Sequence, residues 1–158
     1  MTPHARETRL QAQLALGQML LNSGDGSAAW EAFAAAARSH DGRALNMLGM
    51  CYEDGRGTGT DPAQARAFFG AGARRGDCWA QFNLARQSWA EGQPETAIRW
   101  FEASLATGFK GYWNALIGAL QDIDDPHLQE IAQRARRLGD AAPNPMDGRS
   151  LKTESLIQ

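Results

Sequence analysis

The chain has 158 residues, a net charge of -2 and 43% hydrophobic residues, which suits one domain with a buried core. It lacks the basic surplus that a nucleic-acid binder needs. Its two cysteines are too few for a disulfide framework. No apolar run reaches the ~18–20 residues of a membrane span, and nothing at the N-terminus resembles a secretory signal. We therefore expect a soluble cytoplasmic protein. The excess of Arg over Lys and the abundant Ala and Gly are typical of a bacterial sequence.

In chain order, the pattern predicts helices over residues 5–22, 26–39, 42–54, 61–75, 77–91, 94–107, 111–121 and 125–138. No segment has the alternation of a strand. Residues 1–139 form the predicted repeat domain. Residues 140–158 lose the pattern, and Pro143, Pro145 and Gly148 interrupt any helix there. They are predicted to form a flexible C-terminal tail.

Three series of residues recur with a period of 31–36 residues, which indicates internal repeats. The first helix of each unit carries an apolar residue followed by a small one, at Leu16-Gly17, Leu48-Gly49, Leu84-Ala85 and Ile117-Gly118. The second helices begin at Asp25-Gly26, Asp61-Pro62, Gln93-Pro94 and Asp125-Pro126. The units end at Gly42, Gly76, Gly108 and Gly139. Four helix–turn–helix units follow from this period.

The residue types at these positions have a physical reason. Asp accepts hydrogen bonds from the free N–H groups of a helix start, and Pro suits the first helical position. Gly tolerates the left-handed conformation that ends a helix. The second helices also carry a small residue and a ring at i, i+4, in the pairs Ala29/Phe33, Ala65/Phe69 and Ala97/Phe101. Each helix pair has too little core alone, so stacking must bury the apolar faces.

Residues 44–76, ALNMLGMCYEDGRGTGTDPAQARAFFGAGARRG, resemble one complete repeat of the Sel1-like family, a branch of the tetratricopeptide-like families. The matching positions are Ala44, Leu48, Gly49, Tyr52, Gly55, Gly57, Asp61, Ala65, Phe68/Phe69, Ala71 and Gly76. The likeness is strong over about residues 43–90 and weaker in the other units. Unit four has Gln129 and Gln133 in place of the Ala/Phe pair, as in a polar terminal cap. The resemblance implies a right-handed α-solenoid of about four repeats that acts as an adaptor or scaffold.

Several patterns that suggest catalysis have simpler explanations. The glycines of residues 55–59 follow a helix, whereas phosphate-binding loops follow a strand. Ser39-His40-Asp41 holds the three triad residue types, but adjacent residues cannot form the triad geometry. The histidines lie far apart, and no metal or cofactor is expected. Cys51 and Cys78 are interpreted as small packing residues. The chain is therefore not expected to be an enzyme.

The first helices of this fold class line the concave face of the solenoid. Aligning the units by their apolar-small pairs gives a candidate partner-binding set of Arg43, Asn46, Met50, Trp79, Phe82, Arg86, Trp89 and Tyr112. Trp and Arg are frequent anchors at interfaces, and Arg and Asn form hydrogen bonds with carboxylates. Alternatively, the aromatic residues pack between units and the Arg side chains cover them.

The leading hypothesis is an adaptor whose concave groove binds another protein or peptide, with an acidic or C-terminal group in the ligand. The chain's own Leu156-Ile157-Gln158 is one such segment. A helical accessory or enzymatic domain acting on a small molecule is an alternative, but no titratable groups recur at a recognisable spacing. A structural subunit that forms homo-oligomers through its end faces is another. An apolar, uncapped terminal repeat favours that third hypothesis.

Overall fold

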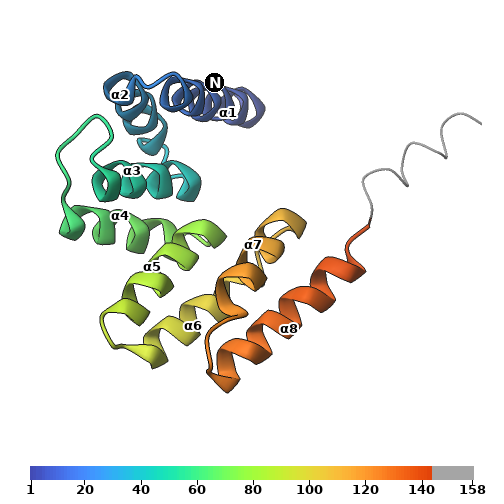
Figure 1. Ribbon diagram of the computed structural model, residues 1–158. Coiled ribbons are helices and arrows are strands. Elements are labelled where there is room, and N and C mark those ends of the chain that lie inside the picture. Colours follow the sequence, from blue (N-terminus) through green and yellow to red (C-terminus); the bar gives the residue numbers. More distant parts are fainter. Residues whose placement is uncertain (144–158) are drawn as a thin grey trace, which may run out of the picture. The chain divides into compact units, whose positions relative to one another are not determined.

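The computed structural model describes residues 1–143 and shows eight helices and no strand within them (Figure 1). The helices are α1 (Pro3–Asn22), α2 (Gly26–Ala37), α3 (Gly42–Asp54), α4 (Pro62–Arg74), α5 (Cys78–Ala90), α6 (Pro94–Ser104), α7 (Lys110–Leu120) and α8 (Pro126–Ala141). The predicted helices and their boundaries are confirmed to within a few residues. Helix α8 continues two residues beyond the predicted domain end at 139. The rest of the predicted tail, residues 144–158, lies outside the described residues.

Aspartates begin the second helices as the sequence predicts. Asp25 accepts a hydrogen bond from the N–H of residue 28, Asp61 from that of residue 64, and Asp125 from those of residues 127 and 128. Gln93 makes no such bond at the start of α6. Two further aspartates, Asp41 and Asp77, cap the first helices α3 and α5 in the same way. Each cap satisfies N–H groups that the helix leaves free.

The predicted series of terminating glycines is mostly wrong. Of these four glycines, only Gly76 adopts a positive φ, of 84°, and Gly108 does not. Gly42 is the first residue of α3, and Gly139 lies inside α8. At the end of α2 the left-handed position belongs to His40, with φ 56°. The spacing was regular because each unit places a small residue near its helix junctions, whether or not that residue ends a helix.

The chain divides into two units, Met1–Gly108 and Phe109–Gln158. In the first unit, the rings of the predicted Ala/Phe pairs form the core. Phe33 and Phe69 are fully buried, and Phe101 is nearly so. Gly17 and Gly49 explain the apolar-small pairs, because a Cβ atom at either position would collide with the ring of Phe33 or Phe69. The small residue on the first helix therefore makes room for the ring on the second.

The second unit, described from Phe109 to Pro143, pairs α7 with α8 around a different core. Tyr112, Leu116, Leu128 and Ile131 are buried, but no phenylalanine occupies the ring position. A Cβ at Gly118 would meet nothing within 4 Å, so this glycine makes room for no ring. The Gln129 that replaces the small residue donates through Nε2 to the carbonyl oxygens of residues 120, 121 and 123 and fixes the α7–α8 turn.

Within the first unit, two of the first helices lie close to each other. Helix α3 contacts α5 directly, whereas α2 and α4 have no contact of similar extent. Stacked repeats curve toward the side on which their helices approach more closely. We call the surface shared by α3 and α5, together with the side of α1 from which Glu7 reaches Arg43, the inner surface of this unit.

Candidate partner-binding surface

The inner surface of the first unit is crossed by hydrogen bonds and ion pairs that join successive first helices. Glu7 of α1 binds Arg43 of α3, and Glu53 of α3 binds Arg86 of α5. We call these side chains, together with Asp41, Asn46, Asn83 and Gln87, the polar ladder. The links Glu7–Arg43, Glu53–Arg86 and Asn46–Asn83 each join one repeat to the next and so favour one register of stacking.

At the α1–α3 step, the Arg43 guanidinium bonds with two carboxylates. Its Nε and Nη2 atoms donate to the two oxygens of Asp41 at 3.0 and 2.9 Å, and Nη2 also donates to Glu7 at 3.2 Å. Burial opposes the ionisation of Asp41, but the hydrogen bond and charge of Arg43 outweigh burial and keep its pKa below the usual value. The pKa of Glu7 is also lowered, by hydrogen bonds from Gln11 and Arg43.

At the α3–α5 step, the Arg86 guanidinium lies against the Glu53 carboxylate. Its Nη2 atom is 2.7 Å from both carboxylate oxygens, and Nε2 of Gln87 donates to the same group at 3.3 Å. One turn away, Nδ2 of Asn83 donates to Oδ1 of Asn46 at 2.9 Å. The Arg86 side chain is 46% exposed, so the pair borders solvent.

Apolar side chains lie beside the ladder on α3 and α5. Met50, Trp79, Phe82 and Trp89 are all half-buried. The ring of Phe82 packs edge-on against Trp79 and against the buried Phe101, with centroids 6.0 and 5.7 Å apart. These contacts hold the rings in place while part of each side chain remains accessible. Groups of this kind suit an interface, where rigid aromatic side chains lose little entropy on binding.

The candidate residues predicted from the sequence thus take different positions. Tyr112 is fully buried in the second unit and cannot line a surface. Asn46 is buried too, and it links repeats rather than facing solvent. Arg43 and Arg86, both candidates for binding a ligand carboxylate, instead bond with separate carboxylates of this chain. The acidic partners Glu7 and Glu53 were missed, although Glu53 lies 33 residues before Arg86, close to one repeat period.

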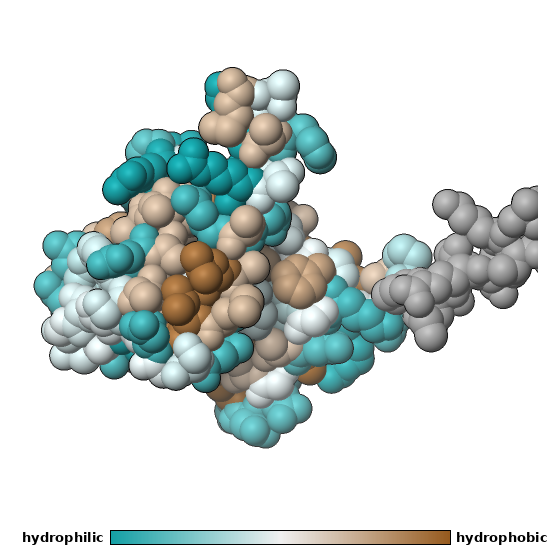
Figure 2. All heavy atoms as spheres, turned by 90° about the horizontal axis from the view of Figure 1, so that it is seen from above, coloured by the Kyte–Doolittle hydropathy of each residue, from teal (hydrophilic) through white to brown (hydrophobic). Residues whose placement is uncertain are grey.

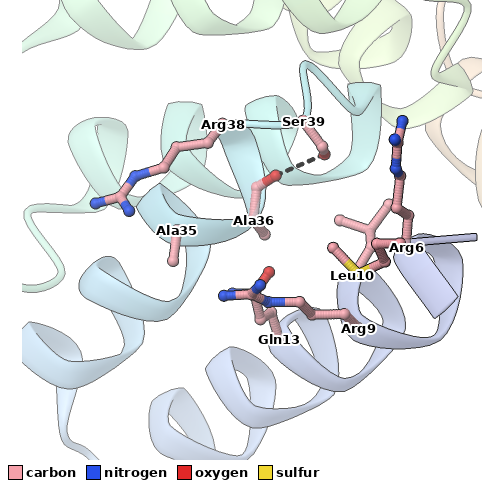
Figure 3. A pocket seen from close by; sticks show the side chains of 9 residues that line it. Arg6, Arg9, Leu10, Gln13, Ala35, Ala36, Arg38 and Ser39 are labelled. Atoms are coloured by element: carbon pink, nitrogen blue, oxygen red, sulfur yellow. Dashed lines mark hydrogen bonds between the residues drawn. The ribbon is translucent and has the colours of Figure 1, made fainter.

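A cavity of about 310 Å³ lies between α1 and α2. Its lining includes Arg6, Arg9 and Arg38, which make no ion pair within residues 1–143. Figure 3 shows that Arg6 and Arg38 point away from each other, so the three guanidinium groups do not converge on one point. The cavity therefore lacks the geometry of an anion site.

The segments that suggested catalysis have structural roles. The hydroxyl of Ser39 donates to the carbonyl of Ala36, and Asp41 caps α3, so neither faces His40 as in a triad. Gly57 lies against the backbone of Gly26, where a side chain would collide with it. Among the described residues, no three His, Cys, Asp or Glu side chains could hold a metal ion, and no helix is long and apolar enough to cross a membrane.

The helices pair, small residues on the first helices make room for the rings on the second helices, and side-chain links join successive first helices. These features define an α-solenoid of helix–turn–helix repeats. The chain is similar to a solved Sel1 repeat protein from Oxalobacter formigenes, with a TM-score of 0.61 and 25% sequence identity. The match covers 83% of this chain and 60% of that protein. No family model and no curated protein matches the chain. The chain is a helical solenoid of Sel1-like repeats.

Proposed function

We propose that the protein is an adaptor that binds a segment of another protein on the inner surface of its first unit. The observation that carries the proposal is the row of half-buried Met50, Trp79, Phe82 and Trp89 beside the exposed guanidinium of Arg86. Aromatic and Arg side chains together are typical of interface hot spots. A repeat fold supports this role because its inner surface presents equivalent positions of successive helices side by side.

The ligand chemistry follows from which donors remain available. Arg43 already uses Nε and Nη2 for Asp41 and Glu7. Within residues 1–143, Arg86 uses only Nη2, for Glu53, so its Nε and Nη1 donors are available for an incoming carboxylate. The apolar residues extend along α5 next to this position. The proposed ligand is an extended or helical segment with an acidic group, or a chain terminus, beside an apolar residue.

The test is a selection of random twelve-residue peptides on the purified protein, with a synthetic peptide of residues 151–158 as a second probe. Selected peptides should carry an acidic residue next to an apolar one. Trp89→Ala should weaken binding by roughly 1–3 kcal/mol, and Arg86→Ala by up to about 1 kcal/mol, as for an exposed ion pair.

The matched controls are Arg99→Ala and Trp100→Ala, which alter the same residue types on the second helix α6. Both should bind like wild type. Circular dichroism should show that all four variants remain helical. Equal affinity in Arg86→Ala, Trp89→Ala and wild type would refute the inner surface as the binding site, whereas no selected peptide at all would refute the adaptor role.

A further inference from the structure

Helix α1 is apolar on two opposite faces. One face packs into the first unit through Leu10, Leu14, Gly17 and Leu21. The other carries exposed Leu16 and Met19, whose exposed fractions are 50% and 68%, together with exposed Ala12 and Ala15. We call Ala12, Ala15, Leu16 and Met19 the end stripe. Figure 2, seen from the side on which α1 and α2 lie in Figure 1, shows apolar surface bordered by hydrophilic residues.

The repeat register explains this second face. A shift of 32 residues aligns Leu16-Gly17 with Leu48-Gly49, and it aligns Ala12 with Ala44 and Met19 with Cys51. In α3 those positions are buried against the second helix of the preceding repeat, in clusters with residues 29, 33 and 36 of α2. In α5 the equivalent Ala80 and Leu84 pack in the same way against α4. The end stripe is therefore a repeat seam that no helix among the described residues covers.

The two terminal helices differ in this respect. The exposed face of α8 carries Glu130, Gln133, Arg136 and Arg137, with Leu138 as its exposed large apolar residue, 38% accessible. A copy of the chain that stacked α8 on the end stripe would bury these charges without partners, at a high desolvation cost. The end stripe therefore finds a better complement in itself than in α8.

We propose that the end stripe docks a second copy of this chain through the same stripe, in a closed two-fold dimer. Such an interface is isologous and must be self-complementary. With the two α1 helices antiparallel and the two-fold axis near residue 14, Leu16 lies against the partner's Ala12, and the large side chain of each copy meets the small one of the other. Arg9 then lies near the C-terminal turn of the partner's α1, which holds no basic residue and where the helix dipole favours a cation.

Sedimentation of the full chain over a range of concentrations tests the proposal. The wild type should approach twice its 17.2 kDa chain mass at high concentration. Leu16→Glu should halve that mass, because it places a carboxylate in the apolar contact. Leu138→Glu, the matched change on α8, should leave it unchanged. A wild type that stays at the single-chain mass throughout would overturn the proposal. So would growth beyond two copies, which indicates stacking of α8 on α1, or a loss of dimer in Leu138→Glu.

A disulfide trap gives an independent readout that survives if Leu16→Glu misfolds. Cys51 and Cys78 are buried, so a cysteine placed on the surface is the thiol that oxidation reaches first. Ala15→Cys lies close to the proposed axis and should form a covalent dimer under mild oxidation. Ala103→Cys, on an exposed position of α6, should remain a single chain. Equal yields of covalent dimer from the two variants, including none from either, would refute the two-fold contact at α1.

Discussion

Phe69 should contribute more to the stability of the first unit than its neighbour Phe68. The Phe69 ring is fully buried, in a cluster with Ala65, Ala73 and Leu84. Burying a side chain of this size contributes about 1.5–3 kcal/mol. Truncation also leaves a cavity, since the facing Gly49 has no side chain to fill it. We therefore expect Phe69→Ala to reduce the free energy of unfolding by about 3–5 kcal/mol.

The assay is denaturant unfolding followed by far-ultraviolet circular dichroism, with Phe68→Ala as the matched control. Phe68 is half-buried and stacks on Tyr52 with centroids 5.5 Å apart, so its truncation opens onto solvent and should cost less. A loss below about 1 kcal/mol for Phe69→Ala, or equal losses for both variants, would refute the assigned register of the repeats.

Three further predictions concern glycines, thiols and the half-buried carboxylate of Asp77. Gly49→Ala should destabilise the protein by about 1–3 kcal/mol, because the new Cβ would lie 2.5 Å from the Phe69 ring. Gly118→Ala lies in open space on a helix and should stabilise the protein by up to about 1 kcal/mol. Equal changes in the free energy of unfolding for the two variants would contradict this. Burial raises the thiol pKa of Cys51 and Cys78 to about 11, so a disulfide reagent at neutral pH should modify them slowly until the protein unfolds. Burial also raises the pKa of Asp77 in the folded protein. The contribution of Asp77 to stability should therefore fall as the pH rises from the unfolded-state pKa, 3.8, through the higher folded-state pKa. Subtracting the stability–pH curve of Asp77→Asn from that of the wild type should isolate this fall, and a flat difference would refute it.

The sequence was sufficient for the repeats because the residues that define them act locally. An aspartate cap, a proline at a helix start and an alanine four residues before a ring each report on one helix, and all three recur with one period. The terminating glycines were less informative, because a small residue near a helix end serves packing as readily as a left-handed turn. Gly42 and Gly139 lie within helices for that reason.

The candidate surface was harder to predict because exposure depends on which helices cover a residue. The alignment placed Tyr112 on the same stripe as Trp79, but Tyr112 is buried. Charge pairing is similarly non-local. Arg86 seemed available until the structure placed Glu53 of the preceding repeat 2.7 Å from it. A search for opposite charges one repeat period apart would have found this pair, and such a rule applies to any solenoid whose first helices touch.

The polar ladder also limits how the adaptor can work. A ligand carboxylate that replaced Glu53 at Arg86 would break a link between α3 and α5. Binding by this replacement would therefore weaken the packing of one repeat on the next. Binding to the remaining donors of Arg86 keeps that link and adds a second acceptor to a cation that is already partly neutralised. The carboxylate should therefore contribute modestly, as exposed ion pairs do, and most of the affinity should come from the apolar residues on α5. On this reasoning Trp89→Ala should weaken peptide binding more than Arg86→Ala, and raising the salt concentration should have only a small effect on the affinity of the wild type.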